Sequence, residues 1–141
     1  MTTQKLEGGC QCGAVRYQIT GEPVMTSVCH CAICRRVSAT PSMAWAMFKK
    51  HQVSFIQGEP AHYESSDAGE RGFCSSCGTQ ISLTATYIPG LIDITLGSLD
   101  NPMAIAPTRH YWGTRRLPWP QFAYSIPKVY EHLPAQEEAT A

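Results

Sequence analysis

The stretch Cys29-His30-Cys31-Ala32-Ile33-Cys34 places three cysteines within six residues. Two flanking segments hold the other four of the chain's seven cysteines: Cys10-Gln11-Cys12 and Cys74-Ser75-Ser76-Cys77. Seven thiols are one too few for two complete tetrahedral metal sites, and an odd number leaves one thiol over in disulfide pairing. The count therefore indicates one closed site with four cysteine ligands and one open site with three, centred on the stretch from Cys29 to Cys34.

The short spacings favour metal over the other uses of cysteine. The sequence shows no charged-then-apolar N-terminal signal and no apolar run long enough to cross a bilayer, so we expect a cytoplasmic protein. In a reducing compartment, clustered cysteines bind metal or do chemistry more often than they form structural disulfides. Scattered core thiols would not produce C-x-C, C-x-C-x2-C and C-x2-C together. Thiolates are soft ligands, which favours zinc or an iron–sulfur cluster over magnesium or calcium.

Length, composition and charge indicate how many domains the chain has and which partners it lacks. The chain has 141 residues, 43% of them hydrophobic, and balances 11 basic against 11 acidic side chains. We expect a single domain over residues 1–134, followed by a flexible tail at 135–141. The balanced charge argues against a nucleic-acid partner, and we expect no membrane partner either.

Short alternating segments broken by glycine and proline predict a mainly β fold. A helical turn is expected at residues 32–37, ending before Pro41. Strands are expected at residues 15–19, 25–31, 43–48, 53–56, 61–64, 81–86, 92–97 and 108–112. Glycines beside Cys10 and after Cys77 allow close approaches of the backbone to bound metal. The three tryptophans are expected in the core.

Geometry narrows the ligand sets only in part. In an extended segment, side chains two apart share a face, so Cys29 and Cys31 present their thiolates together and His30 points the other way. Spacing leaves the pairing of the clusters open, because Cys29 and Cys31 could equally join Cys74 and Cys77.

Four motifs in this order resemble the glutathione-dependent formaldehyde-activating enzyme (GFA) family, also called the CENP-V/GFA family. The resemblance runs from about residue 8 to residue 133. The motifs are Gly9-Cys10-Gln11-Cys12-Gly13-Ala14-Val15-Arg16-Tyr17, Cys29-His30-Cys31-Ala32-Ile33-Cys34-Arg35, Arg71-Gly72-Phe73-Cys74-Ser75-Ser76-Cys77-Gly78 and Gly97-Ser98-Leu99-Asp100. One departure is that the family often has Ser-Gly after the cysteine triplet, whereas Ser38 is followed by Ala39 here.

The resemblance implies a fold, an activity and a partition of the cysteines. It implies zinc-stapled β-sheets of the Mss4-like type with short helical turns. It implies a zinc-dependent carbon–sulfur lyase similar to S-(hydroxymethyl)glutathione synthase, whose partner is a small-molecule thiol or glutathione adduct. Two zinc ions per chain are expected. The implied structural site is Cys10, Cys12, Cys74 and Cys77, and the implied catalytic site is Cys29, Cys31 and Cys34.

Other residues have weaker signals. Arg35 and Arg36 follow the triplet and could hold a substrate carboxylate, although solvated surface charges of this kind are common. His110 could line a pocket or simply pack. Two other functions stay open: a non-catalytic zinc module of the Mss4-like type that binds a protein partner, and a dithiol redox protein. The second lacks the β-α-β pattern of thioredoxin-like proteins.

Overall fold

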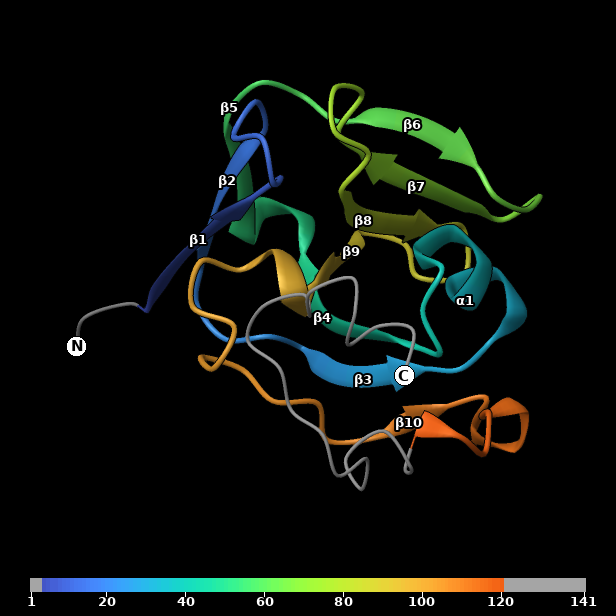
Figure 1. Ribbon diagram of the computed structural model, residues 1–141. Coiled ribbons are helices and arrows are strands. Elements are labelled where there is room, and N and C mark those ends of the chain that lie inside the picture. The colour runs from blue at the N-terminus through green and yellow to red at the C-terminus, as the bar shows by residue number, and fades with distance from the viewer. Residues whose placement is uncertain (1–3, 121–141) are drawn as a thin grey trace, which may run out of the picture.

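The computed structural model describes residues 4–120, and the mainly β fold predicted from the sequence is confirmed (Figure 1). The predicted tail at 135–141 and the end of the predicted domain lie outside the described residues. The strands are β1 (Lys5–Gly9), β2 (Arg16–Thr20), β3 (Met25–Cys29), β4 (Met43–Lys49), β5 (Val53–Gln57), β6 (Ala61–Glu64), β7 (Gly69–Phe73), β8 (Gln80–Ala85), β9 (Leu91–Thr95) and β10 (His110–Tyr111). Helical segments between residues 4 and 120 include α1 (Ala32–Ser38), η1 (Lys50–Gln52), η2 (Leu96–Ser98) and η3 (Gly113–Arg115).

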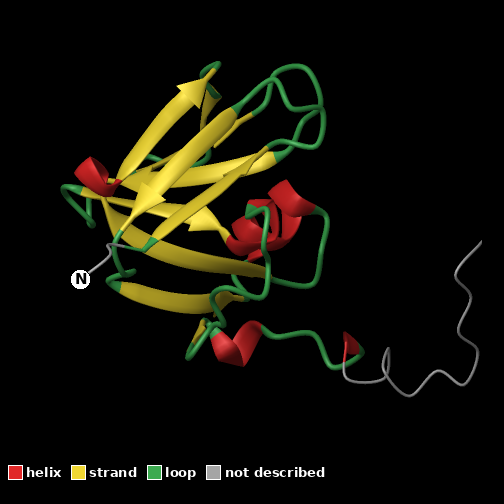
Figure 2. Cartoon of the chain, turned by 90° about the vertical axis from the view of Figure 1, so that its left-hand side faces the viewer, coloured by secondary structure: helices red, strands yellow, loops and turns green. Residues whose placement is uncertain are grey.

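The strands form two sheets. The smaller has the order β1-β2-β5 and is antiparallel throughout. The larger has the order β10-β3-β4-β9-β8-β7-β6, and all its pairs are antiparallel except β10 with β3. Figure 2 shows that strands make up the body of the fold and that short helical segments lie around it. In this strand order, β4 and β9 lie near the middle of the larger sheet, and each has a hydrogen-bonded neighbour on both edges.

Each face of the larger sheet has its own apolar cluster. The main core joins the two sheets and includes Tyr17, Phe48 and Ile94, each at most 1% exposed. The second cluster lies where α1 packs, and it includes Trp45 and Leu83 beside the cysteine triplet. Strand β4 alternates between the two clusters, so it is buried on both faces, as its nearly continuous apolar sequence requires.

Three local features differ from the sequence-based expectation. Strand β1 was not expected, because Lys5–Gly9 contains only one large apolar side chain and ends in two glycines. Strand β3 ends at Cys29 rather than at residue 31, because Cys31 is already the N-cap of α1. The pairing of β7 with β8 shifts register, because Gly72 pairs with Ser82 and Phe73 pairs with Gln80. Ile81 therefore has no partner in β7 and forms a β-bulge. Ile81 packs in the main core while Leu83 packs beside the triplet.

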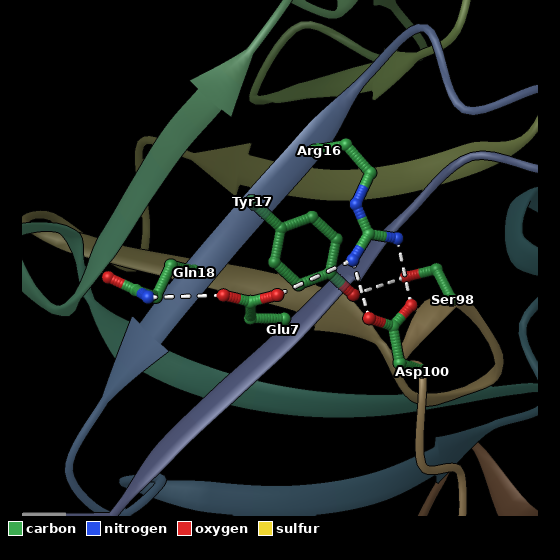
Figure 3. Close-up of polar contacts among 6 residues, drawn as sticks. All are labelled: Glu7, Arg16, Tyr17, Gln18, Ser98 and Asp100. Atoms are coloured by element: carbon green, nitrogen blue, oxygen red, sulfur yellow. Dashed lines mark hydrogen bonds and ion pairs between the residues drawn. The ribbon is translucent and has the colours of Figure 1, made fainter.

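A polar network ties the segment after β9 to the smaller sheet (Figure 3). Arg16 Nη1 donates to Asp100 Oδ1 over 2.8 Å, and a second hydrogen bond joins the same two side chains. The Tyr17 hydroxyl contacts Ser98 Oγ at 2.6 Å. A Cβ atom on Gly8 would overlap the Tyr17 ring, so this glycine serves a close approach. Two of the motifs quoted above thus contact each other, and their polar residues hold the two sheets together.

Candidate metal centres and the adjoining cavity

The structure gathers Cys10, Cys12, Cys74 and Cys77 into one cluster. The first pair lies in the loop between β1 and β2, and the second lies in the turn between β7 and β8. The cluster therefore joins the smaller sheet to the larger one. Its four sulfur atoms lie within 4.8 Å of one another. The grouping of Cys29 and Cys31 with Cys74 and Cys77, which spacing alone left open, is not the one that the structure shows.

The four-cysteine cluster has the dimensions of a zinc site. A zinc–sulfur bond of about 2.3 Å gives a tetrahedron whose sulfurs are about 3.8 Å apart. The Cys10 and Cys12 sulfurs are 3.6 Å apart, and those of Cys12 and Cys74 are 3.8 Å apart. The backbone N–H of Val15 donates to Cys10 Sγ over 3.2 Å, a contact that favours a thiolate. The donor set and its spacing fit a closed structural zinc site.

Both cysteine loops reverse direction through a glycine. Gly13 and Gly78 have φ angles of +83° and +79°, which side chains rarely adopt. In the first loop the N–H of Gly13 donates to the carbonyl of Cys10 over 3.1 Å. In the second, the N–H of Gly78 donates to the carbonyl of Cys74 over 2.8 Å. These similar turns aim both cysteine pairs at a shared centre.

Cys29, Cys31 and Cys34 form a second cluster, with all three sulfurs within 4.8 Å of one another. Cys29 ends β3, Cys31 is the N-cap of α1, and Cys34 lies on the buried side of that helix. The Cys34 N–H donates to Cys31 Sγ over 3.3 Å. The start of the helix therefore places all three thiols on one side of a short segment, and three thiolates suit an open zinc site.

Arg71 supports the Cys34 sulfur from strand β7. Its Nη2 donates to Cys34 Sγ over 3.5 Å, its Nε donates to Ser65 Oγ over 3.0 Å, and its guanidinium lies 5.9 Å from the Trp45 ring centroid. Hydrogen bonds from Cys29 and Arg71 lower the pKa of Cys34 to about 5, although burial opposes the change. The arginine is 4% exposed. A buried cation thus stabilises the thiolate form of the most buried cysteine of the triplet.

The triplet opens onto a cavity of about 640 Å³. All three of its cysteines line this cavity. The other side chains around it are mostly apolar or aromatic, and its described lining contains three charged groups besides the thiols. They are Arg71, Asp93 and Arg115. A small organic molecule of mainly apolar character could therefore lie next to the three sulfur atoms.

The other residues singled out in the sequence, two arginines and two histidines, do not line the cavity. Arg35 is half-buried, Arg36 is exposed, and neither lines the cavity. Their contact with a substrate carboxylate stays a prediction. His30 and His110 lie outside the cavity and pair with each other, the Nε2 of the first 2.8 Å from the Nδ1 of the second. The expectation that His30 points away from the triplet agrees with this contact.

Only one tryptophan follows the expectation of burial in the core. Trp45 is 3% exposed, whereas Trp112 and Trp119 are 61% and 53% exposed. Trp112 instead lines the cavity, and the guanidinium of Arg115 lies 5.8 Å from its ring centroid. Core burial was wrong for these two residues because, within the described residues after Asp100, the chain contributes only the two-residue strand β10 to a sheet.

Sequence reasoning missed the roles of Arg71 and Asp93 at the cavity. They come from strands β7 and β9 of the larger sheet, which lie far along the chain from the triplet. A signal was present for Asp93, which is a charged residue between two buried isoleucines, Ile92 and Ile94. For Arg71 the signal was its place in the third motif, two residues before Phe73. Neither signal indicates which cavity the side chain lines.

Comparison with known proteins supplies the family. The model of the family "Glutathione-dependent formaldehyde-activating enzyme" matches residues 5–115. The chain therefore belongs to this family. Nothing within the described residues forms a helix long and apolar enough to cross a membrane.

Individual relatives agree with the family. The chain is 36% identical over 80 residues to an uncharacterized lyase of Schizosaccharomyces pombe, which covers 57% of this chain and 58% of that protein. It is 27% identical over 112 residues to a candidate glutathione-dependent formaldehyde-activating enzyme of Halomonas elongata, covering 74% of this chain and 71% of that protein. The alignment with the yeast lyase thus spans less than two thirds of that protein. A crystal structure of a Rhodobacter sphaeroides protein shares the fold, with a TM-score of 0.61 and 20% identity over 74% of this chain and 99% of that one.

Proposed function

We propose that the protein is a zinc-dependent carbon–sulfur lyase that acts on a thiol adduct, as S-(hydroxymethyl)glutathione synthase does on glutathione plus aldehyde. The observation that carries this proposal is the position of the cysteine triplet. Three sulfurs within 4.8 Å of one another line a largely apolar cavity of about 640 Å³. A purely structural site has no need of such a cavity.

The two clusters would hold two zinc ions per chain. Cys10, Cys12, Cys74 and Cys77 would hold the structural ion, and Cys29, Cys31 and Cys34 would hold the catalytic one. Zinc held by Cys29, Cys31 and Cys34 would have room to bind a substrate thiol and would lower the pKa of that thiol towards neutrality. Three thiolates leave such a site with a net charge of about −1, which makes it a weak Lewis acid and favours thiol chemistry over hydrolysis.

The protein's own residues position the reaction. Arg71 fixes the Cys34 sulfur through its Nη2 hydrogen bond, and the paired strands β4 and β9 contribute lining side chains to the cavity. Tyr87, Tyr111 and Trp112 line the same cavity and expose part of their rings. Aromatic rings exclude water from a bound adduct and bind its apolar part. The proposed partner is a small thiol or a glutathione adduct, and Arg35 and Arg36, which lie outside the cavity lining, would contact a carboxylate that projects out of it.

Replacement of Cys31 by serine tests this function. We expect Cys31→Ser to lose one of two zinc ions and carbon–sulfur lyase turnover, while the other zinc and the fold remain. Cys10→Ser is the comparison, because it should affect the structural ion instead. If Cys31→Ser retains both its zinc content and its turnover, the proposed function is wrong. A protein that binds one zinc and cleaves no adduct would instead be a non-catalytic zinc module of the Mss4-like type.

The proposal extends to the organisation of the chain. The four-cysteine site joins both sheets, which supports one zinc domain across the described residues, and the limits of that domain at 1–134 and the tail at 135–141 stay predictions. All seven cysteines are free thiols in the structure, a state that suits the reducing cytoplasm.

A further inference from the structure

Asp93 is a carboxylate in an apolar setting. It lies in β9, between the central neighbours β4 and β8, and its register partners there are Met47 and Leu83. All three side chains line the cavity beside the cysteine triplet. Asp93 is half-buried, and no hydrogen bond or ion pair joins its side chain to another described residue. A carboxylate placed in this way costs stability, so its position calls for a functional reason.

Asp93 is also the one carboxylate among the described residues that line the cavity, and no histidine is among them. The nearest candidates for a histidine base, His30 and His110, contact each other outside the cavity. The tyrosines and arginines of the lining are poor proton acceptors near neutral pH. Apart from the cysteines, Asp93 is therefore the lining side chain best suited to accept and donate a proton inside the cavity.

We propose that Asp93 exchanges a proton with the oxygen of a hemithioacetal bound in the cavity, a role that rests on the proposed lyase function. In cleavage, the hydroxyl proton of the adduct passes to the Asp93 carboxylate, and the electron pair of that O–H bond becomes the second carbon–oxygen bond of the aldehyde. The carbon–sulfur bond breaks, and its electron pair stays on sulfur as a thiolate. In synthesis, the thiolate attacks the aldehyde carbon and the protonated Asp93 returns the proton to oxygen.

The charges around Asp93 suit this role. Burial raises the pKa of Asp93 to about 7, the nearby Cys34 adds to the rise, and Arg71 opposes it. Tyr87 also faces this carboxylate, whereas strand β4 presents the uncharged Met47. A general acid–base catalyst works best when its pKa lies near the working pH, since it can then both take up and release the proton.

The test compares Asp93→Asn with wild type and with Asp67→Asn, which removes an exposed aspartate outside this cavity. The rate measured is the exchange of ¹³C-formaldehyde with its adducts of glutathione and of 2-mercaptoethanol, by exchange NMR with the uncatalysed rate subtracted. We expect Asp93→Asn to lower the catalysed rate by at least about 100-fold, with unchanged zinc content. Asp67→Asn should match wild type.

A second readout does not depend on activity. The raised pKa means that the charged carboxylate costs folded-state stability, and this cost grows as pH rises from the unfolded pKa of about 4 towards 7. The melting temperature of Asp93→Asn relative to wild type should therefore increase from pH 5 to pH 8. A catalysed rate within about threefold of wild type, or a difference in melting temperature that does not change with pH, overturns the role of Asp93. If wild type accelerates neither exchange, the proposed function fails and this inference fails with it.

Discussion

Removal of one ligand from the four-cysteine cluster should cost the fold a large part of its stability. Cys10 is the clearest position for this change because it is only 7% exposed and its sulfur accepts a hydrogen bond from the Val15 N–H. Serine has nearly the same size and its hydroxyl oxygen can accept the same bond. The substitution Cys10→Ser therefore removes a zinc ligand with little change in packing.

The expected loss of stability can be worked out from the contribution of a complete zinc site to folding. A structural zinc contributes about 10–16 kcal/mol in small zinc domains, so an equal share for each of four thiolates is about 2.5–4 kcal/mol. An unfolding entropy of about 2.1 cal/mol/K per residue gives roughly 0.3 kcal/mol/K for 141 residues. Cys10→Ser should thus lower the melting temperature by roughly 8–13 °C when zinc is in excess.

The assay is thermal unfolding followed by circular dichroism, with zinc measured by mass spectrometry on the same sample. Gln11→Ala is the matched control, because this exposed side chain lies in the same loop between two ligands. The control should have the same melting temperature and the same zinc content as wild type. If Cys10→Ser also melts within about 3 °C of wild type and binds two zinc ions, the four-cysteine cluster is not a structural zinc site.

Three further changes follow from individual contacts. Ala39 ends α1 with a φ of 54°, so Ala39→Gly should raise the free energy of unfolding by about 0.5–1 kcal/mol in a urea titration, and a loss of stability would contradict the left-handed cap. The Arg16 ion pair lowers the pKa of Asp100. Its stabilisation is present above the unfolded pKa of about 4 and is lost as pH falls through the lowered folded value. Because Asp100 is 51% exposed, Asp100→Asn should cost only about 0.5 kcal/mol at pH 7 and less at pH 3, and an equal cost at both would argue against the pair. Trp112→Ala should leave the melting temperature unchanged but raise KM several-fold, since this ring is 61% exposed and lines the cavity, and an unchanged KM would place the substrate elsewhere.

Much of the fold follows from local sequence patterns. The segments after β1 that alternate apolar and polar residues form strands near their expected positions, and the turn at Pro89-Gly90 has the positive φ at Gly90 that a type II turn needs. The exceptions have physical causes. Strand β1 lacks an alternating pattern because Gly8 must fit against the Tyr17 ring, and the register shift in β8 changes which face Ile81 occupies.

The candidate site was predictable only in its cysteines. The short spacings predict that the cysteines bind metal. Their grouping into sets of four and three depends on which loops the two sheets bring together. Arg71 and Asp93 reach the cavity from β7 and β9, and no local pattern links either residue to α1. Such contacts depend on sheet order, which spacing along the chain does not encode.

The catalytic role of the cysteine triplet is tested by a chelator titration of wild type in which bound zinc and adduct exchange are measured on each sample. We expect two zinc ions per chain at the start. Removal of the more weakly held ion should abolish the catalysed exchange in proportion to its loss, while the circular dichroism spectrum stays that of the folded protein. Catalysed exchange that persists at full rate in a folded protein with one zinc would contradict the assignment of catalysis to Cys29, Cys31 and Cys34.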